Sequence, residues 1–133
     1  KSLLNAYYNT AQDLGVTVAY EAQVKHVAIE GGRFEHVEVE VAGAPARVSG
    51  RAVVLASGGF QADIDWLASA WGPAARNFLI RGTPYNRGVV LRDMLDQGAE
   101  SVGDPSHCHA VAIDGRSPKF DGGTVTRLAE LAT

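Results

Sequence analysis

The stretch Arg51-Ala-Val-Val-Leu-Ala-Ser-Gly-Gly-Phe60 decides how the rest of the chain is interpreted, because a fully apolar run stops there at small residues. Residues 52–56 show no alternation of polar and apolar positions, which predicts a strand buried on both faces inside a parallel sheet. Ser57, Gly58 and Gly59 follow where such a strand would leave the sheet. Small residues let a ligand approach backbone amides closely, so the turn is a candidate anion site, although a purely steric role for the glycines stays open.

The part of the chain before this stretch has two patterns. Apolar residues at three- and four-residue spacing over residues 3–14 predict an amphipathic helix with one buried face, and residues 16–20 predict a short strand after it. From residue 23 to residue 50 the pattern alternates and contains two glycine turns. That pattern predicts a three-stranded antiparallel meander with one charged face.

The part after this stretch predicts two helices joined by loops. Helical spacing marks residues 61–70 and 89–97, and the apolar residues 78–80 predict a short strand between them. Residues 81–88 contain glycine, proline, asparagine and arginine, a composition typical of loops that line sites. The order of elements predicts a mixed α/β (α+β) fold.

Composition excludes several classes of protein. With 133 residues, 46% of them hydrophobic, the chain can bury the core of one domain. A net charge of -3 with interspersed signs argues against nucleic-acid binding, and the apolar runs are too short for membrane insertion. The single cysteine, Cys108, is consistent with a reducing compartment, so a cytoplasmic location is expected.

A cluster of ionisable residues, His107-Cys108-His109, lies near the end of the chain. A metal site would need a third ligand, for which Asp104 is the nearby candidate, and a Cys–His pair is disfavoured because neighbours on a strand face opposite ways. A histidine that donates to an anionic substrate, beside Arg81 or Arg87, is more plausible and favours carboxylate recognition. No metal ion is therefore expected.

Several motifs together resemble the succinate dehydrogenase/fumarate reductase flavoprotein family. Besides the 51–60 stretch they are Trp71-Gly-Pro73, Arg81-Gly-Thr-Pro-Tyr-Asn86, Cys108-His-Ala-Val-Ala-Ile-Asp114 and Lys119-Phe-Asp-Gly-Gly123. Within the family they are most similar to the tricarballylate dehydrogenase branch, which oxidises tricarballylate to cis-aconitate with FAD. The resemblance implies a central fragment of an FAD-binding Rossmann-like domain: residues 1–106 as its partial domain, and 107–133 as the start of a substrate-capping region.

The resemblance also implies which residues meet the cofactor. The backbone around Val24 would approach the adenine, and Gly88 is the one match to the family's Thr-Gly-Asp-Gly, which is replaced here by Arg87-Gly-Val-Val90. No flavin contact is carried over for the family's aspartate. The residues of the 51–60 stretch that would line FAD are Ala56, Ser57, Gly58 and Gly59.

The family binds a substrate carboxylate through the histidine of a Gln-x-His-Pro segment, for which His109 is the counterpart here, with the alignment shifted by one residue and the proline absent. His109, Arg81 and Arg87 are the expected ligands of a polycarboxylate substrate. The family's dinucleotide fingerprint and its proton-donating arginine have no counterpart in this sequence. The chain is accordingly expected to need the remainder of the flavoprotein for activity, and no catalytic residue is assigned.

Two alternatives remain open from the sequence. The chain could belong to another flavoprotein of the same fold, such as a fumarate reductase or a 3-ketosteroid dehydrogenase. It could also be a non-catalytic α+β module in which the two consecutive glycines only allow the backbone to turn.

Overall fold

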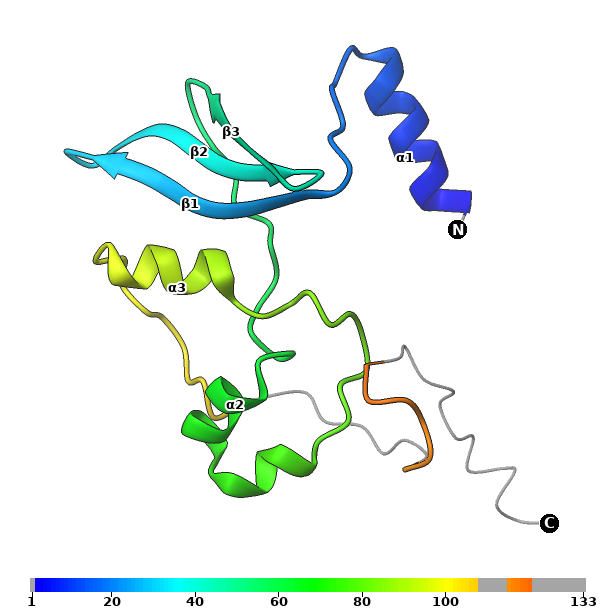
Figure 1. Cartoon of the computed structure of the whole chain (residues 1–133), viewed down its shortest axis with the longest axis vertical. Helices are drawn as coiled ribbons and strands as arrows, with labels where there is room; N and C mark the ends of the chain where they lie inside the picture. Colours follow the sequence, from blue (N-terminus) through cyan, green and yellow to red (C-terminus); the bar gives the residue numbers. More distant parts are fainter. Residues whose placement is uncertain (1, 108–114, 121–133) are drawn as a thin grey trace. The chain divides into compact units, whose positions relative to one another are not determined.

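The computed structural model describes residues 2–107 and 115–120, and the chain forms two compact units, Lys1–Arg51 and Ala52–Thr133, where length alone favoured one. Each unit is described by itself. The predicted domain boundary at residues 106 and 107 stays a prediction. The elements are α1 (Ser2–Asp13), β1 (Ala22–Glu30), β2 (Arg33–Val41), β3 (Ala44–Ser49), α2 (Ile64–Trp71), the 3-10 helix η1 (Pro73–Asn77) and α3 (Val89–Asp96) (Figure 1).

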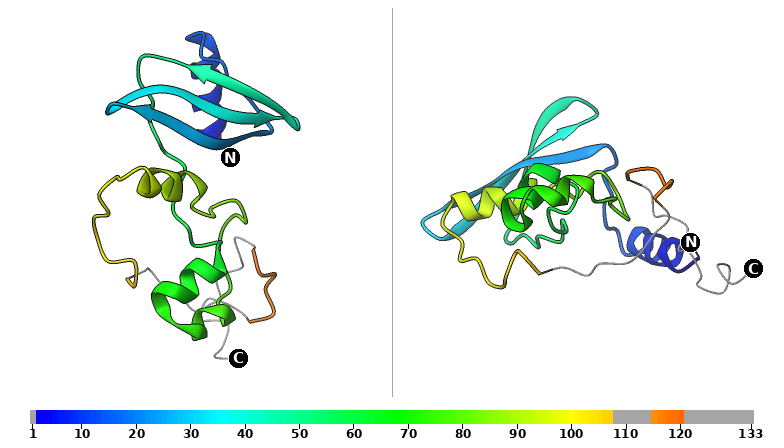
Figure 2. Two further views of the ribbon diagram at one scale, coloured as in Figure 1. Left: turned by 60° about the vertical axis from the view of Figure 1, so that its left-hand side comes forward. Right: turned by 90° about the horizontal axis from the view of Figure 1, so that it is seen from below.

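The sheet of the first unit confirms the predicted meander. Its strands run antiparallel in the order β1-β2-β3, as Figure 2 shows. Both connections are tight turns whose central residues have positive φ, 56° and 77° at Gly31 and Gly32 and 48° and 82° at Ala42 and Gly43. Such turns match the right-handed twist of paired strands, which explains why two-residue loops suffice.

Two irregularities interrupt the register of β1 against β2. One gives β1 an extra residue at Lys25, and the other gives β2 an extra residue at Glu35. Val27 and Ala28 lie between the two irregularities, in regular register opposite Val37 and His36, so they face opposite sides of the sheet, and both are buried. The strict alternation predicted for this strand is therefore wrong at its centre.

The charged face of the meander is neutralised by cross-strand pairs. Glu38 accepts a hydrogen bond from Arg47 at 2.9 Å, and Glu40 lies 3.4 Å from the Lys25 ammonium group. These groups are partly exposed, so each pair contributes only about 0.2–1 kcal/mol.

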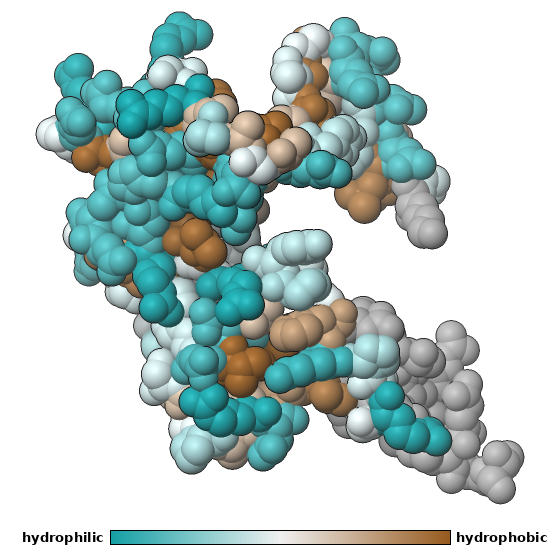
Figure 3. Space-filling model, viewed as in Figure 1, coloured by the Kyte–Doolittle hydropathy of each residue, from teal (hydrophilic) through white to brown (hydrophobic). Residues whose placement is uncertain are grey.

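The predicted burial of α1 is wrong. No residue of this helix is buried, and Leu3, Leu4 and Tyr7 are 66%, 62% and 66% exposed. The apolar side chains of α1 lie at the surface in the space-filling view of Figure 3. No helix or strand of the described residues packs against α1, so its apolar stripe has no partner surface among them. Residues 16–20 are also not a strand.

The second unit is built around a small apolar cluster. Ala62, Leu67, Ala75 and Ile80 are buried together, and partly buried aromatic and aliphatic side chains surround them. The predicted strand at 78–80 is only a parallel bridge between Ile80 and Phe120, with the Ile80 N–H donating to Lys119 at 2.9 Å. The two predicted helices are confirmed, although α2 begins at Ile64 rather than at Gln61.

The predicted buried strand at residues 52–56 is not formed in the structure. These residues have no regular secondary structure, and Val54 is 89% exposed. A strand requires a neighbour to pair its backbone groups. In the described part of the chain, β1, β2 and β3 pair only with one another, so an apolar run alone did not suffice.

None of the helices among the described residues has the length and apolar character that crossing a membrane requires.

Candidate functional site

Residues 57–59, which we call the glycine turn, are in contact with two polar side chains. Gly58 has φ 76°, in the left-handed region, and a Cβ built on it would lie 3.1 Å from Oδ1 of Asn86. A Cβ built on Gly59 would lie 3.1 Å from Oε1 of Gln61. Glycine is therefore favoured at position 58 both by its backbone angle and by its neighbour. Residues 57 and 58 are exposed, so the backbone of the turn is accessible.

An aromatic pair, Phe60 and Trp66, begins at the residue that follows the glycine turn. The Phe60 and Trp66 rings are stacked, with centroids 4.2 Å apart. Gly88 is buried against both, and a Cβ built on it would lie 2.4 Å from Cζ3 of Trp66 and 2.6 Å from Cβ of Phe60. The Ala62 N–H donates to the Asn86 carbonyl at 2.9 Å. These contacts fasten the loop before α3 to the segment before α2.

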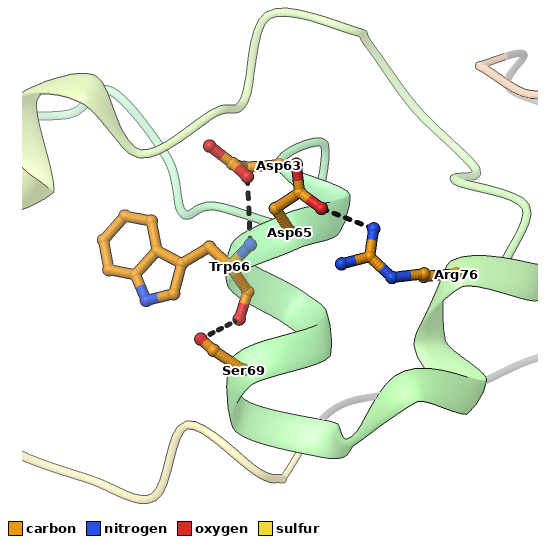
Figure 4. Close-up of polar contacts among 5 residues, drawn as sticks. All are labelled: Asp63, Asp65, Trp66, Ser69 and Arg76. Atoms are coloured by element: carbon orange, nitrogen blue, oxygen red, sulfur yellow. Dashed lines mark hydrogen bonds and ion pairs between the residues drawn. The ribbon is translucent and has the colours of Figure 1, made fainter.

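The N-terminus of α2 is fixed by local polar contacts (Figure 4). Asp63 is the N-cap residue, and its carboxylate accepts a hydrogen bond from the Trp66 N–H at 3.0 Å. The Ser69 hydroxyl donates to the Trp66 carbonyl at 2.7 Å. Asp65 pairs with Arg76 of η1. The cap sets the start of α2 and thereby positions the Trp66 ring against Gly88 in the loop before α3.

Two arginines lie beside Trp66. The Arg92 guanidinium carbon is 4.2 Å from the Trp66 ring centroid, a cation–π arrangement. Arg87 and Arg92 both border a hollow of about 390 Å³, which Arg81 does not line. The other residues around it are Asp63, Asp65, Trp66 and Ser69. The structure thus places Arg87 in a mixed-charge hollow that Arg81 does not line.

An apolar groove of about 720 Å³ runs between α2 and α3. Its lining includes Gly59 of the glycine turn, and also Trp71, Met94 and His107. The Trp71 indole N–H donates to the Pro105 carbonyl at 2.9 Å, which holds the segment before the histidine cluster against α2. The groove therefore brings one predicted cofactor residue and the start of the predicted substrate segment to a common surface.

Asp104 organises that segment. Its carboxylate accepts hydrogen bonds from the Ser106 hydroxyl at 2.6 Å and from the Ser106 N–H at 2.8 Å, and these bonds lower the pKa of Asp104 below its ordinary value. The His107 Nε2 lies 3.6 Å from the other carboxylate oxygen. Within residues 2–107 and 115–120, no group of three potential metal-ligating side chains occurs.

The predicted site residues are distributed unevenly. Gly58, Gly59 and Gly88 lie near one another through their contacts with Asn86, Gln61, Phe60 and Trp66. Val24 lies in β1 opposite Val39 and is half-buried, within the other unit. Ala56 and Ser57 lie on the exposed segment, and His109 lies outside the described residues.

Sequence reasoning missed Asn86 and Arg92. Asn86 ends the motif 81–86, and the loop composition indicated a site-lining segment but could not single it out. Arg92 lies on a helix whose spacing predicts its buried face, and no local signal indicates that its guanidinium stacks on Trp66. Both contacts join residues far apart in the chain, which a local pattern does not encode.

A family model described as FAD binding domain matches residues 1–120 of the chain. This match covers the first unit and residues 52–120 of the second, and it includes the glycine turn and α3. No curated protein and no solved structure matches the chain.

Proposed function

Since the chain belongs to the FAD binding domain family, we propose that its glycine turn forms part of the FAD site of an oxidoreductase. The observation that carries the proposal is the family match, which extends across the turn. Membership of this family makes FAD the cofactor of the full-length protein.

The residues of the turn fit a group held by backbone amides. Residues 54–58 are exposed, and Gly58 and Gly59 present no side chain to keep a ligand away. Amide N–H groups in such a turn suit negatively charged or electron-rich ligand atoms. The residues in and just before the turn that are proposed to contact FAD are Ala56, Ser57, Gly58 and Gly59. Contacts of Val24, in the other unit, and of Gly88, buried against Phe60 and Trp66, stay expectations from the family resemblance.

We further propose a polycarboxylate substrate, with tricarballylate as the first candidate. Bound FAD would supply the hydride acceptor of the oxidation. Arg81 and Arg87 carry permanent positive charges on exposed side chains, and guanidinium groups bind carboxylates in a bidentate manner. His109 is proposed to donate a further hydrogen bond to a substrate carboxylate.

The substrate is tested with the full-length gene product. Dehydrogenation of tricarballylate, reduction of fumarate and dehydrogenation of a 3-ketosteroid are assayed in parallel. We expect tricarballylate to have the highest kcat/KM. Preference for either of the other substrates would replace the substrate proposal and leave the FAD proposal intact.

The role of Arg87 is tested by Arg87→Ala. Loss of a charge-assisted hydrogen bond of about 1.5–3 kcal/mol predicts a KM for the polycarboxylate raised about 10- to 100-fold. Arg76→Ala is the matched control, because Arg76 is exposed and pairs with Asp65 instead. An equal effect of both substitutions would remove Arg87 from the substrate site.

The FAD proposal is tested by Gly58→Val with Gly98→Val as control. Both glycines have positive φ, 76° and 91°, but a Cβ meets a neighbour only at Gly58. We expect Gly58→Val to lower flavin content in the full-length gene product far more than Gly98→Val does at similar loss of stability. Equal flavin content in the two variants would favour the non-catalytic module.

A further inference from the structure

Asn86 is the residue most closely placed against the glycine turn. The three heavy atoms nearest to a Cβ built on Gly58 all belong to the Asn86 side chain: Oδ1 at 3.1 Å, Cγ at 3.2 Å and Nδ2 at 3.3 Å. Because these distances are nearly equal, the planar face of the amide, rather than a single atom, covers Gly58.

A second contact fixes Asn86 itself. Its carbonyl accepts the Ala62 N–H at 2.9 Å, and Ala62 is 3% exposed. Two residues later, Gly88 is packed against Phe60 and Trp66. The backbone of Asn86 is thus held from the buried side of the unit, while its half-buried side chain reaches toward the exposed turn.

Besides Asn86, the turn has a side-chain neighbour in Gln61, whose Oε1 would lie 3.1 Å from a Cβ built on Gly59 rather than on Gly58. Residues 54–58 are exposed and have no regular secondary structure. Gly58 has φ 76°, and glycine populates regions of positive and of negative φ about equally well. A glycine without a fixed neighbour samples those regions freely. A flat side chain placed over one face restricts this sampling through van der Waals contact.

We propose that Asn86 is the positioning residue of the glycine turn: its side chain confines Gly58 to the left-handed conformation and so fixes the directions of the Gly58 and Gly59 amides. The consequence for FAD affinity rests on the proposed function. Asn86 acts through Gly58, because a turn that is already ordered loses less conformational entropy when it binds a ligand.

Substitutions at Asn86 can distinguish its effect on the glycine turn from a general loss of stability. Asn86→Ala keeps the backbone carbonyl that accepts from Ala62, and it leaves Gly88 in place. The substitution therefore removes the cover of Gly58 alone. Asn86→Asp retains a planar group of the same size over Gly58, and Asn77→Ala removes an exposed asparagine in η1 as the matched control.

The first measurement requires no FAD. The full chain, labelled with ¹⁵N-glycine, is examined by NMR relaxation. We expect the amide order parameters of Gly58 and Gly59 to be about 0.85 in the wild type and in Asn86→Asp. In Asn86→Ala we expect them to fall below about 0.6. Unchanged order parameters in Asn86→Ala would overturn the proposal. If Asn86→Ala does not fold, Asn86→Ser, which also lacks the planar cover, takes its place in the same comparison.

The second measurement is FAD affinity in the full-length gene product. A lost contact of about 1.4 kcal/mol corresponds to tenfold weaker binding, which we expect for Asn86→Ala but not for Asn77→Ala. Thermal midpoints of the apoproteins should agree within about 1 °C, less than the roughly 2–4 °C that 1 kcal/mol causes in a protein of 150–250 residues. Equal affinities would overturn the link to FAD. If the wild type binds no FAD, the proposed function fails, and the order parameters still decide the role of Asn86.

Discussion

Gly58 and Gly88 share a left-handed backbone, with φ 76° and 70°, but glycine is required at the two positions for different reasons. Gly58 is exposed, and its neighbour is one half-buried polar side chain. Gly88 is buried under two aromatic residues. A side chain at Gly58 would mainly alter the accessible turn, whereas one at Gly88 would displace the packing of Phe60 and Trp66.

Gly88→Ala should therefore destabilise the second unit strongly. A left-handed alanine costs about 1–2 kcal/mol, and overpacking adds about 1–3 kcal/mol, because the new Cβ would lie 2.4 Å from Trp66. Urea denaturation followed by tryptophan fluorescence measures the loss. Gly98→Ala has the same kind of backbone strain, but no neighbour lies within 4 Å of a Cβ built on Gly98. It should therefore cost only about 1–2 kcal/mol, for the left-handed backbone. A loss no larger than that of Gly98→Ala would contradict the packing role.

At this scale the sequence predicted the small residues of the turn but not their neighbours. Ser57, Gly58 and Gly59 stand out because they interrupt an apolar run. The significance of Gly88 is different, since it depends on Trp66, which is distant along the chain. Steric contacts of that kind arise only after folding.

Helices and turns with local signals were predicted from the sequence, although the predicted start of α2 at Gln61 lies three residues before the observed start. Asp63 precedes α2 with the side chain that caps require, and paired glycines or Ala-Gly mark the two hairpin turns. Residues 52–56 show the opposite case. Their apolar composition favours burial, but whether they form a strand depends on another segment of the chain that can pair with their backbone groups.

The cap of α2 gives a prediction at the scale of an element. Asp63→Ala should lower the free energy of unfolding by about 1 kcal/mol, because the Trp66 N–H loses its acceptor. Asp63→Asn should retain most of the stability. Asp65→Ala, which breaks an exposed ion pair with Arg76, should cost about 0.5 kcal/mol or less. Thermal denaturation of the three variants gives the order, and a larger effect of Asp65→Ala would be inconsistent with the capping role.

At the scale of the whole molecule, the chain has two compact units that meet in sequence between Arg51 and Ala52. Composition predicted enough apolar material for a core, but it could not reveal how that material is divided. Among residues 2–107 and 115–120, few are buried in either unit, and several large apolar side chains, including Leu14 and Val102 at 77% and 90%, are exposed.

Limited proteolysis tests this division. Arg51 is exposed and lies outside regular secondary structure, whereas Arg33 and Arg47 lie in β2 and β3. Trypsin should cleave after Arg51 at least about tenfold faster than after Arg33 or Arg47, since cleavage requires local opening of the backbone. Mass spectrometry of the early fragments identifies the site. Protection of Arg51 would instead support the strand that the sequence predicted at residues 52–56.

The meander has a consequence for how molecules of this protein meet in solution. The three-stranded sheet has two edge strands, β1 and β3, and unpaired strand edges can pair with strands of another molecule. Here β3 spans six residues and contains Pro45, which has no N–H to donate, while the bulge at Lys25 twists β1 and places a charge there. The irregular register that made this strand hard to predict is thus also a safeguard against edge-to-edge aggregation.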